Sequence, residues 1–370
     1  MANTETRSQK WDRLVKTIRR EKTDRPPVVI MGPIPCAKLA DSEVIVADAV
    51  ERPEWFLDKA YDGLDILGDV DAVQGFSSAL SKTKGLNFMC RVKLPGVELG
   101  RDDMIQILEE PKMTHEDYDY ILTKGWKAFQ QKYIAEVLGI VPEDYALGKR
   151  FRKYAEEKMA ASQYVEWGGG GSPSAWDMLT SMRGMTRFFR DLRKDPQLIK
   201  EVIAKIHSEC FPDFQAGLSK GNALTVMVQP GVRCNCDFVN RKIFEEFTWP
   251  YVKMYADAVL EAGKYVHFHY DARWDDFLDF FTYFPKNCCI FDSDGATDIH
   301  KVGQILGDRM AITGNITASL LTLGTPEEVY AQVKEQMDEF GDGYLICSAC
   351  TLPSNCKPEN LKAMVAACRA

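Results

Sequence analysis

The sequence lacks several features that mark particular classes of protein. Its 370 residues contain no apolar run of membrane-spanning length, and residues 1–22 are polar and charged, so we expect neither a membrane span nor a secretory signal. A net charge of -8 argues against a nucleic-acid-binding protein. The 11 cysteines are odd in number and scattered, which favours a reducing cytoplasm over a disulfide scaffold.

Histidine is also scarce, and two of the 5 histidines fall in one short stretch, Lys264–Asp271. Apolar and aromatic residues alternate there with polar ones, which predicts a β-strand. Because side chains alternate across a strand, one face carries packing residues and the other carries potential metal ligands. The packing residues are Val266, Phe268 and Tyr270, and the potential ligands are His267, His269 and Asp271. The alternative is a half-exposed edge strand whose polar face meets water.

Strand and helix patterns alternate regularly in the C-terminal half. Strands are expected at 223–229, 264–270, 287–292, 310–315 and 343–347, and helices at 241–262, 274–281, 299–306 and 326–340. This alternation predicts a parallel sheet covered by helices, and repeat lengths of roughly 23 to 41 residues suit a (β/α)8 TIM barrel. A doubly wound open sheet is the alternative, but no G-x-G-x-x-G motif follows any strand.

The N-terminal part is less regular, and we assign the whole chain, 1–370, to one barrel domain. Residues 1–25 are expected to form an N-terminal helical extension. A short strand is expected at 28–31, another from Ile66, and a long helix from Thr114 to about Leu138. Residues 141–172 include four consecutive glycines, Gly168 to Gly171, and such runs are flexible, so this segment is predicted to be a lid or insertion, or a disordered loop.

In a TIM barrel the active site is built from the C-terminal ends of the strands and the loops that follow them. Polar and thiol side chains occupy most of these predicted ends. They include Cys234, Cys236, His269, Asp271, Asp292, Asp294, Asn315, Cys347 and Cys350. Among these and their neighbours we assign catalytic roles to Asp292, Asp294 and Tyr270. Substrate-binding roles are assigned to Arg183, Asn315 and Trp274. The alternative for Arg183 is an ordinary salt bridge on the surface of a helix, and the alternative for the aromatic residues is core packing.

Several stretches of the C-terminal half resemble the uroporphyrinogen decarboxylase superfamily, which includes zinc-dependent, corrinoid-linked methyltransferases. The stretches are Phe244–Tyr251, His269–Trp274, Leu306–Asn315, Leu323–Val329, Cys350–Pro353 and Pro358–Met364. The resemblance covers roughly residues 170 to 370, and the stretches are specific for the superfamily only when taken together. It implies a TIM barrel.

The resemblance is closer to the methyltransferase branch than to the decarboxylases. The decarboxylases follow Arg-Pro-Pro with an arginine-rich loop that binds substrate carboxylates, but here Arg25–Pro27 is followed by Met31–Ala37, which has no arginine. The methyltransferases bind zinc through a His-x-Cys pair and a late cysteine. His269 and Cys350 match two of these ligands, and Asp271 stands at the position of the middle cysteine. Zinc accepts all three donors.

The resemblance therefore implies a zinc-dependent enzyme that transfers a methyl group to the Co(I) corrinoid of a partner protein. Because Asp271 replaces a thiolate, a donor with an oxygen- or nitrogen-linked methyl group, such as a methoxylated aromatic, is favoured over a thiol substrate. A decarboxylase or lyase, and a non-catalytic tetrapyrrole-binding protein, remain the alternatives. We expect a cytoplasmic protein, and the sequence leaves open whether it forms a homodimer.

Overall fold

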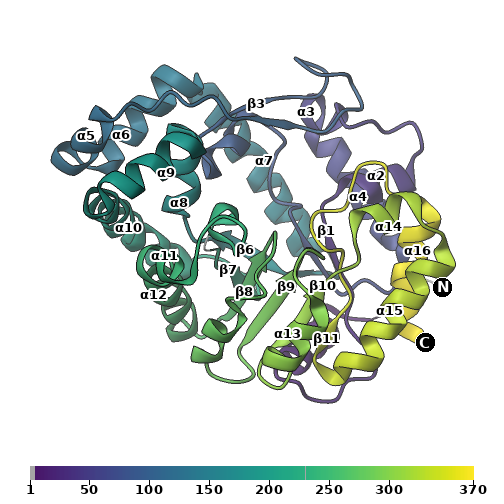
Figure 1. The fold of residues 1–370 in the computed structure, drawn as a ribbon. Helices are drawn as coiled ribbons and strands as arrows, with labels where there is room; N and C mark the ends of the chain where they lie inside the picture. Colours follow the sequence, from purple (N-terminus) through teal and green to yellow (C-terminus); the bar gives the residue numbers. More distant parts are fainter. Residues whose placement is uncertain (1–4, 230) are drawn as a thin grey trace.

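Parallel strands form a closed ring at the centre of the molecule (Figure 1). The structure is a computed structural model that describes residues 5–229 and 231–370. In chain order the ring contains β1 (Val29–Met31), β2 (Ala72–Gln74), β5 (Val165–Glu166), β6 (Gly168–Gly171), β7 (Thr225–Met227), β8 (Tyr265–Tyr270), β9 (Cys289–Ser293), β10 (Ala311–Gly314) and β11 (Tyr344–Leu345). Only Trp167 separates β5, which pairs with β2, from β6, which pairs with β7, so the two occupy one position in the ring. A bridge between Val28 and Ile346 joins the last position to the first. The predicted (β/α)8 barrel is confirmed.

Helices surround this ring (Figure 1). They are α2 (Ile34–Ala40), α3 (Asp48–Glu51), α4 (Pro53–Leu67), α8 (Ala175–Arg183), α9 (Met185–Lys194), α10 (Pro196–Leu218), α11 (Arg241–Phe247), α12 (Trp249–Glu261), a 3-10 helix (Leu278–Tyr283), α13 (Ile299–Leu306), α14 (Ala318–Leu323), α15 (Pro326–Phe340) and α16 (Pro358–Ala366). The capping box at Thr325 and Glu328 opens α15 as its sequence predicts. No helix in the described ranges is both long and apolar enough to cross a membrane.

A long insertion, residues 75–164, follows β2. It contains the antiparallel pair β3 (Arg91–Lys93) and β4 (Gln106–Leu108), then α5 (Glu116–Lys124), α6 (Trp126–Tyr133), a π-helical turn (Ile134–Leu138) and α7 (Pro142–Ala161). The single long helix expected here is wrong, because Gly125 breaks it with φ +98°. The strand expected from Ile66 is also wrong, since Ile66 lies in the last turn of α4 and the strand begins at Ala72.

The glycine run expected in a lid or loop lies instead in the barrel wall. Gly168–Gly171 form β6, which pairs with β7. A Cβ on Gly169 would lie 2.4 Å from the Cβ of Ala223, and one on Gly168 would lie 2.9 Å from Oε1 of Gln74. Glycine is therefore placed where neighbouring chain segments approach closely, and its local flexibility is overridden by strand pairing.

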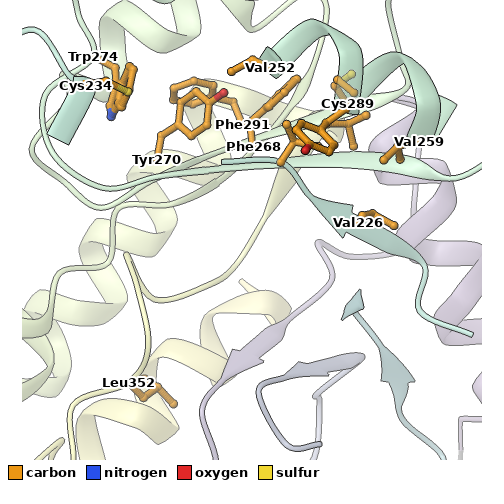
Figure 2. Packing of buried hydrophobic residues seen from close by; sticks show 14 of the residues in the cluster. Val226, Cys234, Val252, Val259, Phe268, Tyr270, Trp274, Cys289, Phe291 and Leu352 are labelled. Carbon is orange, nitrogen blue, oxygen red and sulfur yellow. The ribbon is translucent and has the colours of Figure 1, made fainter. Parts of the chain in front are cut away.

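Two hydrophobic clusters lie on the two sides of the barrel wall. The smaller cluster is inside and contains Leu14 and Ile18 of α1 (Arg7–Ile18), packed with residues such as Ile290 and Leu345. The predicted N-terminal extension therefore contributes side chains to this inner core. The larger cluster lies between the strands and the outer helices (Figure 2) and contains Phe268.

Candidate metal centre

The histidines of β8 point into the barrel, as the alternating pattern predicts. His267 is 0% exposed and His269 is 7% exposed. Phe268 and Tyr270 point the other way, toward α12, with Val252 and Val259 nearby (Figure 2). The edge-strand alternative does not hold, because β8 pairs with β7 on one side and β9 on the other.

Three predicted ligands meet at the C-terminal end of the barrel. The ligand atoms of His269, Asp271 and Cys350 all lie within 4.8 Å of one another. Nε2 of His269 is 3.4 Å from Oδ1 of Asp271 and 3.6 Å from Sγ of Cys350. His269 and Asp271 come from the end of β8. Cys350 follows β11 and lies 79 residues after Asp271 in the sequence (350 - 271). Barrel closure is what brings them together.

Asp292 orients His269 through a hydrogen bond. Strand pairing sets His269 directly beside Asp292 of β9, and Nδ1 of His269 donates a hydrogen bond of 2.6 Å to Oδ2 of Asp292. The same oxygen accepts a hydrogen bond of 2.9 Å from Nε2 of His267. When His269 is neutral, with its proton on Nδ1, the lone pair of Nε2 is directed toward Asp271 and Cys350.

The charges of this buried group are strongly coupled. Burial opposes protonation of His269, but the carboxylate of Asp292 overrides it and raises the pKa of His269 well above its usual value. Burial likewise favours a neutral Asp292, but the neighbouring histidines lower its pKa below the usual value. Burial raises the pKa of Asp271. A cationic metal near Asp271 would favour its ionised form.

One glycine gives Asp292 the space that it occupies. Gly314, at the end of β10, has φ +89°. A Cβ there would lie 2.4 Å from the carbonyl oxygen of Ser293 and 2.5 Å from Oδ1 of Asp292. Neither contact can be accommodated without displacing the strand end, so glycine at this position is part of how the site is built. No local sequence pattern indicates this role.

Four of the remaining assignments need correction. Asp292 is fully buried between two histidines, which makes it a positioning residue rather than an acid or base in contact with substrate. Tyr270 is 1% exposed and lies in the aromatic core outside the barrel, so it cannot act at the mouth. Trp274 is also 1% exposed, and its Nε1 donates to the carbonyl oxygen of Asp271. Arg183 pairs with Asp191 at 2.7 Å, so its alternative of a salt bridge holds, but the pair is buried and not on the helix surface as that alternative expected.

Two candidates lie in the loops that follow β9 and β10. Both carboxylate oxygens of Asp294 accept backbone hydrogen bonds, from Ala272 at 2.7 Å and from Ala296 at 2.8 Å. Asp294 thus fixes the loop that follows Asp271. Asn315 is half-buried with φ +65°, and its role in substrate binding remains a prediction.

The other cysteines lie outside the ligand group. Cys347 is 1% exposed inside the barrel, and burial raises its pKa well above the usual value. Cys234 is fully buried, where its thiol donates to the carbonyl oxygen of Gly231. Cys236 accepts a hydrogen bond from the backbone of Asp276. The thiols of Cys234, Cys236 and Cys347 are therefore not part of the candidate ligand group.

Comparison with known proteins is consistent with this architecture. No curated protein matched the chain. A solved structure described as a methyltransferase from Methanosarcina mazei aligns with a TM-score of 0.68 and 15% sequence identity, covering 97% of this chain and 98% of that one. This similarity shows a shared fold. Residues 167–370 match the family described as uroporphyrinogen decarboxylase (URO-D). Because that match covers more than half of the chain, the chain belongs to the URO-D family.

Proposed function

We propose that this protein is a zinc-dependent methyltransferase. It would move a methyl group from an oxygen- or nitrogen-linked donor, such as a methoxylated aromatic, to the Co(I) corrinoid of a partner protein. The observation that carries this proposal is the meeting of His269, Asp271 and Cys350 at the C-terminal end of the barrel. In TIM-barrel enzymes the chemistry takes place at this end.

The spacing of these three side chains fits a zinc ion. With zinc–nitrogen, zinc–oxygen and zinc–sulfur bonds of about 2.0, 2.1 and 2.3 Å, tetrahedral coordination separates nitrogen from sulfur by about 3.5 Å and nitrogen from oxygen by about 3.3–3.4 Å. The distances from Nε2 of His269 are 3.6 Å to Sγ of Cys350 and 3.4 Å to Oδ1 of Asp271. Oδ1 of Asp271 is also a buried oxygen without a hydrogen-bond partner in the described chain. A metal ion would satisfy it.

The donor set favours a hard methyl donor. It combines an imidazole, a carboxylate and one thiolate, which together donate less charge to a metal than a thiolate-rich set. When bound there, zinc would supply Lewis acidity toward the heteroatom that carries the methyl group. The chain's own contribution is orientation, because Asp292 holds the Nδ1 proton of His269 and Asp294 fixes the loop after Asp271.

The proposal is tested first by metal content. Protein purified without chelators is expected to contain about one equivalent of zinc, because zinc accepts all three of these donors. Cys350→Ala should lose the metal, whereas Cys347→Ala, a matched change three positions earlier in the chain, should retain it. Wild-type protein that stays metal-free after zinc is added would contradict the metal site.

The second test measures activity. Zinc-loaded protein is mixed with a methoxylated aromatic or a methylated amine and with chemically reduced cobalamin, and methylcobalamin is followed by its absorbance. Wild type should form it and His269→Ala should not. Release of carbon dioxide from an aromatic acid without any corrinoid would instead support the decarboxylase alternative.

A further inference from the structure

A second histidine lies beneath the candidate metal centre without reaching it. His267 precedes His269 by two positions on β8, so both side chains point into the barrel, and His267 is 0% exposed. Its Nε2 is 2.9 Å from Oδ2 of Asp292, the oxygen that also accepts the Nδ1 proton of His269. Its ring meets Trp167 edge-on, with the two ring centres 5.7 Å apart.

The other ring nitrogen of His267 shows that this histidine is more than a packing residue. Nδ1 is buried and has no hydrogen-bond partner within the described ranges. An unsatisfied buried nitrogen is unfavourable, and a phenylalanine of similar shape would avoid it. The histidine is therefore best explained by the hydrogen bond that its opposite nitrogen donates to Asp292.

We propose that His267 is a positioning residue, which fixes the carboxylate of Asp292 so that His269 presents Nε2 to a metal. With Nε2 of His267 on one side and Nδ1 of His269 on the other, Oδ2 of Asp292 is held between two donors. The absence of a side chain at Gly314 leaves room for Oδ1 in this orientation, since a Cβ there would lie 2.5 Å from it. The hydrogen bond from His267 also draws charge from the carboxylate and so weakens its pull on the Nδ1 proton of His269. The metal-directed part of this inference rests on the proposed function, while the hydrogen-bond arrangement does not.

The test compares two replacements of His267. His267→Gln retains an N–H at nearly the place of Nε2, whereas His267→Phe retains ring volume and loses the donor. Trp167→Phe is a packing control, because Trp167 is a ring neighbour of His267 and forms no hydrogen bond with Asp292 in the described part of the chain. Zinc affinity is measured by competition with a chelator, and cobalt(II) in place of zinc reports ligand geometry through its visible spectrum. Loss of a group that hydrogen-bonds a metal ligand directly costs about 10–100-fold in metal affinity, and for His267, which acts through Asp292, we take the lower value of about tenfold.

We expect His267→Phe to weaken zinc binding by that factor and to change the cobalt spectrum, with His267→Gln and Trp167→Phe close to wild type. Equal zinc affinity and an unchanged spectrum in His267→Phe would overturn the inference. Equal losses in the folded Gln and Phe variants would also overturn it, because shape and not the donor would then be responsible.

A second readout does not depend on metal. In metal-free protein labelled with 15N-histidine, the Nδ1 proton of His269 should exchange slowly with water in wild type and in His267→Gln, and rapidly in His267→Phe. With only 5 histidines in the chain, these resonances can be assigned by substitution. If wild type binds no zinc, the proposed function fails, and this exchange alone decides the role of His267. Slow exchange retained in His267→Phe would then reject it.

Discussion

Two neighbouring residues of β8, Phe268 and His269, have side chains on opposite faces of the strand and different expected roles. His269 points into the barrel mouth, where it can bind a metal, and Phe268 points into the outer core at 0% exposure. We predict that His269→Ala abolishes zinc binding and activity while leaving the fold intact. Phe268→Ala should lower the free energy of unfolding by about 3–5 kcal/mol, because it removes a large buried side chain. Chemical denaturation, metal analysis and turnover distinguish the two. If His269→Ala unfolds the protein and Phe268→Ala does not, the assignment of these side chains to the inner and outer faces of β8 is inverted.

The position where this chain departs from the His-x-Cys pattern makes a separate prediction. Asp271→Cys should hold or improve zinc retention, because bonds of about 2.3 Å to sulfur and about 2.0–2.2 Å to oxygen differ only modestly. A thiolate donates more charge and lowers the Lewis acidity of the metal, so turnover of an ether or amine donor should fall. Asp271→Ala should lower zinc affinity. Zinc content and turnover are measured for wild type and both variants.

If Asp271→Ala keeps full zinc and full activity, Asp271 is neither a ligand nor an orienting residue. Period-two alternation assigns His269 and Asp271 to one face before any tertiary structure is known, whereas Cys350 was added to the ligand group through the family resemblance. The same alternation places Tyr270 on the packing face, so its catalytic assignment went against the pattern and the buried position follows the pattern. Trp274 could not be placed, since its direction depends on how the loop after β8 packs.

At the scale of the element, β6 gives the clearest test of how packing overrides local preference. A Cβ on Gly169 would lie 2.4 Å from the Cβ of Ala223, just before β7. We predict that Gly169→Ala destabilises the protein by about 1–3 kcal/mol through overpacking of this strand pair. Adding Ala223→Gly should recover much of the loss, because it removes the opposing methyl group. Denaturant titration of the two single variants and the double variant measures this coupling.

Gly148, in the middle of α7, is the matched control. A Cβ there would meet no atom within 4 Å. Gly148→Ala should therefore stabilise α7, by about 0.5–1 kcal/mol. If Gly169→Ala is as harmless as Gly148→Ala, then β6 does not approach β7 as closely as described. The same contrast explains why the sequence misled at this run, because glycine indicates flexibility locally and close approach only when the neighbouring strand is known.

At the scale of the whole molecule, the regular second half of the chain predicted the barrel and the first half did not. Alternating apolar patterns located β8, β9 and β10 within a few residues. The first half carries a long insertion after β2, and its ring strands β1, β2 and β5 have only two or three residues, which are too short to show a period. Closure of the ring through Val28 and Ile346 depends on contacts between the two ends of the chain, which no local pattern encodes.

The stability of the whole molecule should depend on a histidine far from the metal centre. His207 of α10 is buried against α12, with Nδ1 3.1 Å from the hydroxyl of Tyr255 and its ring stacked on Tyr251. Burial lowers its pKa from 6.5 to about 3. Between these values the unfolded chain binds a proton that the folded protein excludes, so stability is full above about pH 6.5 and falls as the pH decreases. This group alone contributes a slope of up to about 1.4 kcal/mol per pH unit.

The test compares the pH dependence of unfolding in wild type and in His207→Phe, which retains a ring against Tyr251 and cannot be protonated. Denaturant titrations between about pH 4.5 and 7 should show a shallower loss of stability in the variant than in wild type. His300→Gln is the control, because His300 is exposed, and pairing with Glu339 raises its pKa instead, so its loss should steepen the acid dependence slightly if it changes it at all. Equal slopes for wild type and His207→Phe would show that His207 takes up a proton in the folded state as readily as in the unfolded chain. The packing between α10 and α12 would then have to admit water or a counter-charge at this ring.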